Sequence, residues 1–162
     1  MGPLAQAVAQ RAQAFAMSVA YTDRQPHVGV THRYVETVEA LAAEVDHLVI
    51  AAAPEAVTPG WVGAEALRAL GPTGHVVNVS ATTALDAEVL TQALKDKAIA
   101  GAALDVFWEA PRVPAALRAM PQVVLTPHIG HATLQGQHEM VAQAIAQLRA
   151  FFKGDAAPPV TA

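Results

Sequence analysis

His128 is the residue whose type and position most suggest chemistry. It stands in "LTPHIGHAT", residues 125–133, just after the apolar run "VVL" and a Thr-Pro pair. Imidazole has an unperturbed pKa of about 6.5, so a histidine at the mouth of a sheet can transfer a proton near neutral pH. The alternative is a polar residue that closes a strand, because loops are generally polar. The rest of the chain has to decide between these two interpretations.

Gly2 and Asp23 form a second candidate constellation. Gly2 opens a helical pattern, and Asp23 ends a short β-branched and aromatic run about 20 positions later. A dinucleotide site needs glycines against the pyrophosphate, a helix amino end, and an acidic residue at this distance for the ribose hydroxyls. The full pattern is G-x-G-x-x-G, whereas "MGPLA" keeps only the second glycine and has Ala5 in place of the third. The pair alone is therefore an incomplete signal.

Two further patterns are interpreted as ordinary loop residues. The segment "HIGH", residues 128–131, has His138 nearby but lacks the Cys, Asp or Glu partners that complete a metal site, so we predict no metal. Ser80, Thr82 and Thr83 lack the glycine-flanked elbow of a nucleophile, and we expect them in a loop near a cofactor.

Composition limits the class of protein. The 162 residues are 53% apolar and 15% charged, which suits one globular domain, and the net charge of −4 contains no basic block, which excludes a nucleic-acid partner. Cysteine is absent, which excludes disulfides and thiolate catalysis and fits a reducing compartment. The longest apolar run, from Leu48, is too short to span a membrane, and the amino end lacks a signal pattern. We therefore expect a cytoplasmic protein with no membrane partner.

Hydrophobic periodicity predicts alternating helices and short strands. The residue 46–54 segment is a continuous apolar run, which is typical of a strand buried on both faces. Short strands joined by helices favour a parallel sheet, so we predict a doubly wound α/β domain over residues 1–154 and a flexible, proline-rich tail over residues 155–162. The predicted strands are 18–24, 28–35, 46–54, 75–80, 99–107 and 121–127, and the predicted helices are 1–17, 37–45, 62–71, 85–97 and 132–154.

Three motifs carry a family resemblance. "VVNVSATTALD", "IAGAALDVFWEAP" and "VVLTPHIGHAT", in this order and at these separations, resemble the nicotinamide-binding domain of the D-isomer-specific 2-hydroxyacid dehydrogenases. That group includes phosphoglycerate, glyoxylate and hydroxypyruvate reductases. The resemblance extends over nearly the whole chain and implies a Rossmann-like domain that binds NAD and an activity on small 2-oxo or 2-hydroxy acids.

The resemblance assigns roles to individual residues. It implies that His128 is the general acid, that Asp105 lies near the nicotinamide, and that Asn78 ends the strand before the catalytic loop. It places Asp23 on the adenosine ribose, where its charge repels a 2′-phosphate and favours NAD over NADP, while Arg24 keeps NADP open. The implied cofactor-binding residues are Gly2, Leu4, Asp23, Arg24, Pro54, Thr58, Asn78, Val79, Asp105, His128 and Gly130.

Two positions depart from the family pattern. Ala81 stands where the family has an arginine that holds the substrate carboxylate, and Ala110 stands where it has a glutamate that pairs with the histidine. Glu109 lies one residue earlier, but a shift of one residue normally turns a side chain to another side. Loss of one positioned electrostatic group typically costs roughly 10²–10³ in rate, and loss of acid–base support costs about 10²–10⁴. We therefore expect impaired turnover.

We also expect the chain to lack the first Rossmann strand and the substrate domain. Either the sheet closes across the position of that strand or another segment fills it. The apolar stripe of the last helix is then partly exposed or pairs with another subunit, so a homodimer is one of the alternatives. The stripe includes Met140, Ile145, Leu148 and Phe152. Trp108 either covers the nicotinamide cleft or anchors its loop, and we favour the second. The alternatives to an enzyme are a non-catalytic NAD(H)-binding module and a degenerate remnant.

Overall fold

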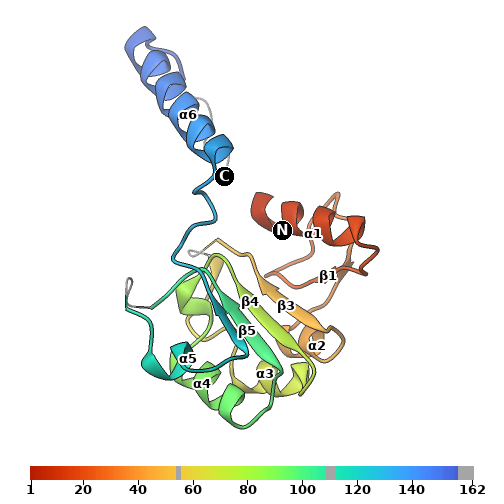
Figure 1. Cartoon of the computed structure of the whole chain (residues 1–162). Coiled ribbons are helices and arrows are strands. Elements are labelled where there is room, and N and C mark those ends of the chain that lie inside the picture. The colour runs from red at the N-terminus through yellow and green to blue at the C-terminus, as the bar shows by residue number, and fades with distance from the viewer. Residues whose placement is uncertain (54–55, 109–111, 157–162) are drawn as a thin grey trace. The chain divides into compact units, whose positions relative to one another are not determined.

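Helices and strands alternate along the chain, as the sequence predicts. The computed structural model describes residues 1–53, 56–108 and 112–156. The short helix Ala115–Arg118 and the 3-10 turn Thr82–Ala84 were not predicted, because elements of four and three residues are too short to show a period. The elements, drawn in Figure 1, are α1 (Pro3–Ala14), β1 (Ala20–Tyr21), β2 (Arg33–Tyr34), α2 (Val38–Ala42), β3 (His47–Ile50), α3 (Ala64–Leu70), β4 (His75–Asn78), η2 (Thr82–Ala84), α4 (Ala87–Lys95), β5 (Gly101–Leu104), α5 (Ala115–Arg118), β6 (Val123–Leu125) and α6 (Leu134–Lys153).

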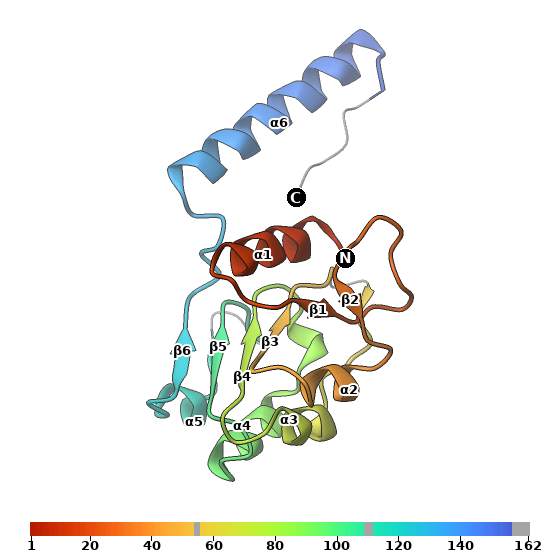
Figure 2. The same ribbon diagram turned by 90° about the vertical axis from the view of Figure 1, so that its right-hand side faces the viewer.

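The strands form two separate parallel sheets, both visible in Figure 2. One has the order β3-β4-β5-β6 and the other consists of β1 and β2. We expected one sheet, either closed across the position of a first strand or completed by another segment. In the described residues, β1 and β2 instead form a sheet separate from the one that contains β3 to β6. Because β1 and β2 have only two residues each, few backbone groups are left unpaired at their edges, which limits the cost of the separation. The fold is a Rossmann-like α/β arrangement.

One face of the larger sheet is buried. Leu48 and Ile50 of β3 are 5% and 3% exposed, whereas the alternating Val49 is 37% exposed. The expectation that this strand is buried on both faces is therefore wrong. The inward side chains pack with leucines of α3 and α4 into a single core, and within residues 1–127 the opposite face of the sheet keeps apolar side chains such as Val124 accessible.

Local signals fix the ends of the helices that cover the core. The side chain of Asp86 accepts hydrogen bonds from the amides of Glu88 and Val89 and so begins α4. Gly71 ends α3 with a φ of 80°, a conformation that glycine adopts without steric cost. These ends set the short connections that return the chain to the next parallel strand.

The chain divides into two compact units, Met1–Pro127 and His128–Ala162. In the second unit, Thr133 caps α6 by accepting a hydrogen bond from the Gly136 amide, and Gly154 ends it in the left-handed conformation. None of the residues of α6 is buried in the single chain, and the apolar side chains of its stripe are exposed there, so partial exposure and pairing with another subunit both stay predictions. Among the helices of the described residues, none is long and apolar enough to cross a membrane.

Candidate cofactor-binding site

The carboxyl ends of the parallel strands line up because the hydrogen-bond ladder continues one residue beyond each of them. In an open α/β sheet this edge is where ligands bind. It therefore gathers residues that the sequence places directly after the apolar runs. The continuing bonds run from the Val79 amide to the Ile50 carbonyl (3.2 Å), from the Asp105 amide to the Asn78 carbonyl (3.0 Å) and from the Thr126 amide to the Leu104 carbonyl (3.0 Å).

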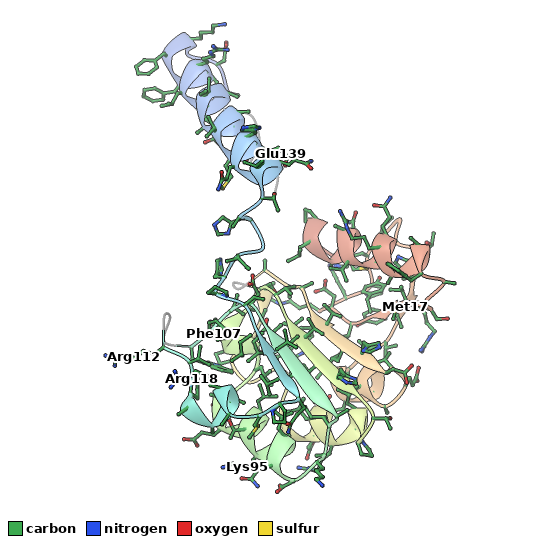
Figure 3. All side chains as sticks on the ribbon, viewed as in Figure 1. Met17, Lys95, Phe107, Arg112, Arg118 and Glu139 are labelled. Atoms are coloured by element: carbon green, nitrogen blue, oxygen red, sulfur yellow. The ribbon has the colours of Figure 1, made fainter. Side chains whose placement is uncertain are left out.

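Asp105 and Thr126 are joined across two neighbouring strand ends. The Thr126 hydroxyl donates a hydrogen bond of 2.6 Å to Oδ1 of Asp105. The next two residues, Val106 and Phe107, are buried, and Phe107 is labelled in Figure 3. Because those side chains anchor the chain in the core, the carboxylate of Asp105 is held at the edge of the sheet, where it can accept a hydrogen bond from a bound ligand.

Asn78 is engaged inside the protein. Its side chain is 1% exposed, its Nδ2 donates to the Ala81 carbonyl at 2.9 Å, and its Oδ1 accepts from the Ser80 and Ala81 amides at 3.2 Å. The side chain thus closes the turn after β4, which assigns it a structural task in this loop. The sequence prediction that Asn78 binds the cofactor directly stays a prediction.

The loop after β4 packs tightly. Ala81, for which the resemblance implies an arginine in relatives, is 0% exposed, and the Ser80 hydroxyl donates to the Ile50 carbonyl at 3.1 Å. The turn after β3 is tied to the same loop, since the Gly60 amide donates to the Thr83 carbonyl at 2.8 Å. Thr58 is exposed in that turn. The predicted residue Pro54 lies outside the described residues.

Asp23 is the centre of a polar cluster just after β1. Its Oδ2 accepts from the Met1 ammonium group at 3.0 Å and contacts His27 Nε2 at 2.7 Å, and its Oδ1 accepts from the Arg24 amide at 2.8 Å. Burial raises the pKa of Asp23, but these hydrogen bonds from Met1, His27 and Arg24 outweigh it and lower the pKa to about 2. The carboxylate is therefore ionised throughout the physiological range.

The amino end of α1 fits an anionic group. Gly2 is the N-cap, no side chain caps the first turn, and a Cβ built on Gly2 would meet no atom within 4 Å. Unpaired amides at a helix start attract phosphates. Leu4, another predicted contact, is 41% exposed in the first turn. The start of α1 and the carboxylate of Asp23 thus have the donor and acceptor chemistry that a pyrophosphate and a ribose require.

His128 is the first residue of the second unit. It is exposed and adopts a φ of 54°, a left-handed conformation that few residues other than glycine adopt and in which asparagine, aspartate and histidine are enriched. Its ring lies 5.7 Å from that of His131, and Gly130 is exposed in the same segment. Glu109 and Ala110 lie outside the described residues. Within the described part of the chain, no group of three or more His, Cys, Asp or Glu residues could hold a metal ion.

Trp108 anchors its loop. Its indole Nε1 donates to the Leu85 carbonyl at 2.6 Å, and the side chain packs against the core. This contact supports the anchoring interpretation of Trp108. A tryptophan NH buried at such a position normally finds an acceptor, so the bond fixes the orientation of the ring.

Sequence reasoning missed two polar side chains of the site. Thr126 follows the run "VVL" just as Asp105 follows "AAL", and comparing the two strand ends could have found it. His27 gives no such signal, because its contact with Asp23 depends on how the loop after β1 folds back.

Comparison with known proteins places these features in a family. Residues 1–130 match the family model described as "D-isomer specific 2-hydroxyacid dehydrogenase, NAD binding domain". The glyoxylate/hydroxypyruvate reductase A of Arabidopsis thaliana is 34% identical over 154 residues, which is 95% of this chain and 49% of that protein. The glyoxylate reductase of Pyrococcus furiosus is 34% identical, over 97% of this chain and 48% of that protein.

Solved structures agree with these relatives. The NADPH-dependent glyoxylate/hydroxypyruvate reductase of Sinorhizobium meliloti, in complex with citrate, matches with a TM-score of 0.90 at 38% identity, over 96% of this chain and 50% of that one. The same enzyme in complex with NADP and malonate matches with a TM-score of 0.84 at 37% identity, over 96% of this chain and 49% of that one. The chain therefore spans about half the length of the proteins it matches.

Proposed function

We propose that this chain binds NAD(H) at the carboxyl ends of its parallel strands and serves the reduction of a small 2-oxo acid. The chain belongs to the D-isomer specific 2-hydroxyacid dehydrogenase family, and it matches the NAD binding domain of that family. The observation that carries the proposal is the alignment of Asp105 and Thr126 at the carboxyl ends of β5 and β6, with Asp23 after β1. Relatives named as glyoxylate and hydroxypyruvate reductases support the substrate class.

The residues divide the binding task by their chemistry. Asp23, ionised, accepts hydrogen bonds from ribose hydroxyls, and the uncapped start of α1 receives the pyrophosphate. Asp105, held by Thr126, accepts from the nicotinamide end. The bound cofactor supplies the hydride. His128 supplies the proton to the substrate oxygen, because imidazole exchanges protons near neutral pH.

Turnover is expected to be weak. The buried methyl group of Ala81 supplies no charge for the substrate carboxylate, whereas the arginine that the resemblance implies for this position in relatives can bind a carboxylate through two parallel hydrogen bonds. This observation also favours a second candidate function, a module that binds NAD(H) without catalysing its oxidation.

A fluorescence titration with NADH tests the proposal. Excitation of Trp61 and Trp108 should give saturable energy transfer to the bound nicotinamide. Asp105→Ala should weaken the affinity at least about fivefold, as loss of a hydrogen bond to a charged group implies, whereas Asp96→Asn, at the exposed end of α4, should leave it unchanged. A folded sample that gives no saturable transfer would overturn the proposal.

Turnover separates the two candidate functions. In the presence of glyoxylate or hydroxypyruvate, slow NADH oxidation that His128→Asn abolishes, with NADH affinity retained, would support the reductase. NADH binding with no oxidation above the rate in buffer would support the non-catalytic module.

A further inference from the structure

His27 lies next to the carboxylate on which the choice between NAD and NADP depends. Its Nε2 contacts Oδ2 of Asp23 at 2.7 Å, and its side chain is 41% exposed, so a bound nucleotide can reach it. The loop is fixed in this shape, because the His27 amide donates to the Tyr21 hydroxyl at 2.9 Å and the Tyr34 hydroxyl donates to the Asp23 carbonyl at 3.2 Å.

The carboxylate retains capacity for one more donor. An ionised carboxylate offers about four acceptor sites. The Met1 ammonium, His27 Nε2 and the Arg24 amide account for three contacts with Asp23. A single ribose hydroxyl completes the set, whereas a 2′-phosphate brings only acceptors and a negative charge.

Protonation changes what His27 presents. A carboxylate accepts hydrogen bonds only, so the nitrogen that faces Asp23 carries a hydrogen in both charge states. Neutral His27 then has an acceptor at Nδ1, which repels a phosphate oxygen. Protonated His27 has a donor at Nδ1 and a positive charge, in a loop that also carries the permanent charge of Arg24.

Protonation of His27 also changes the net charge of the loop. The charges of Asp23 and Arg24 cancel, so these two residues and His27 are neutral overall when His27 is neutral and carry one positive charge when it is protonated. Among the described residues, the Met1 ammonium shares Oδ2 of Asp23 with His27, the Tyr21 ring lies 6.2 Å from that of His27, and the Tyr34 hydroxyl donates to the Asp23 carbonyl.

We propose that His27 is a specificity-determining residue of the nucleotide site: neutral His27 leaves Asp23 to select NAD(H), and protonated His27 admits the 2′-phosphate of NADP(H). The proposal rests on the proposed function, since it requires that the nucleotide binds beside Asp23. It adds a titratable group to the choice of cofactor, and it is compatible with a relative whose solved structure holds NADP.

Binding of the oxidised nucleotides tests the proposal, since NAD⁺ and NADP⁺ both withstand mild acid. Calorimetric dissociation constants are measured for both between pH 5.5 and 8.5 on the full chain. The ratio of the NADP⁺ constant to the NAD⁺ constant should fall about fivefold more in the wild type than in His27→Asn as the pH decreases, the effect of one nearby exposed charge. The His27→Asn variant corrects for the 2′-phosphate, which itself titrates near pH 6.

Two further variants sharpen the result. His27→Lys, which keeps a positive charge over this range, should bind NADP⁺ with the pH dependence of His27→Asn but with higher affinity. His47→Asn, at the exposed amino end of β3, should behave as the wild type.

The outcomes distinguish the inference from the proposed function. If both nucleotides bind but wild type and His27→Asn show the same pH dependence, the inference is wrong and the proposed function stands. If neither nucleotide binds to folded protein at any pH, the proposed function is wrong and the inference is lost with it.

Discussion

The hydroxyl of Thr126 donates a 2.6 Å hydrogen bond to the carboxylate of Asp105, and this bond links the ends of β6 and β5. Both residues also continue the backbone ladder beyond their strands. The carboxylate is thus fixed by its own backbone and by its neighbour's side chain. Such a supporting residue sets the orientation of a binding group without itself touching a ligand.

Thr126→Val tests that support. It keeps the β-branched shape and removes the donor, so the unfolding free energy should fall by about 0.5–1.5 kcal/mol. Affinity for NADH should fall as well, because Asp105 gains freedom. Urea denaturation and the NADH titration measure the two effects, and Thr73→Val, in an exposed turn, is the matched control. Unchanged affinity together with reduced stability would limit Thr126 to a role in folding.

Asn78→Ala should be among the most destabilising single changes in the chain. It leaves the Ala81 carbonyl and the Ser80 and Ala81 amides without their partner in a buried turn. Each unsatisfied buried group costs about 1–3 kcal/mol, although the losses are not additive, so we expect a loss of at least about 2 kcal/mol. The urea midpoint measures it. A loss below about 0.5 kcal/mol would mean that water replaces the amide.

Ala81→Arg should fail to restore a substrate clamp. Ala81 is 0% exposed, so a guanidinium at this position must either be buried without a partner or force the loop open. We expect a loss of at least about 2 kcal/mol in unfolding free energy and no gain in NADH oxidation with glyoxylate. Ala119→Arg, on the exposed end of α5, controls for the added charge. A stable and faster Ala81→Arg variant would show that the loop rearranges without cost.

The sequence predicts the elements better than their assembly. The predicted strands 75–80 and 99–107 contain β4 and β5 and extend beyond them, since hydrophobic periodicity is a local property. The separation into two sheets was not predicted, because strand pairing depends on partners far apart in the chain. The burial of Ala81 and the contact of His27 with Asp23 depend on loop packing, which leaves no periodic trace.

Acid should weaken the folded state through Asp23. Its pKa is about 2 in the folded protein, below its ordinary value of 3.8, so folding favours the ionised form. The stabilisation is complete above the ordinary value and disappears as the pH falls from about 4 towards 2. Because the side chain is 33% exposed and solvent screens the pairs, the contribution should be no more than about 1 kcal/mol.

Asp23→Asn isolates this contribution, because the amide keeps the shape of the side chain and removes its titration. The wild type should be more stable than the variant at pH 7, and the difference should shrink towards zero by pH 2. Urea midpoints at pH 2.5, 3.5, 5 and 7 measure the difference, and Asp96→Asn shows how a surface carboxylate outside the cluster behaves. A difference that stays constant over this range would mean that the ammonium and imidazole contacts of Asp23 do not persist in solution, and the loop after β1 would then lack the fixed carboxylate that the proposed selection of NAD requires.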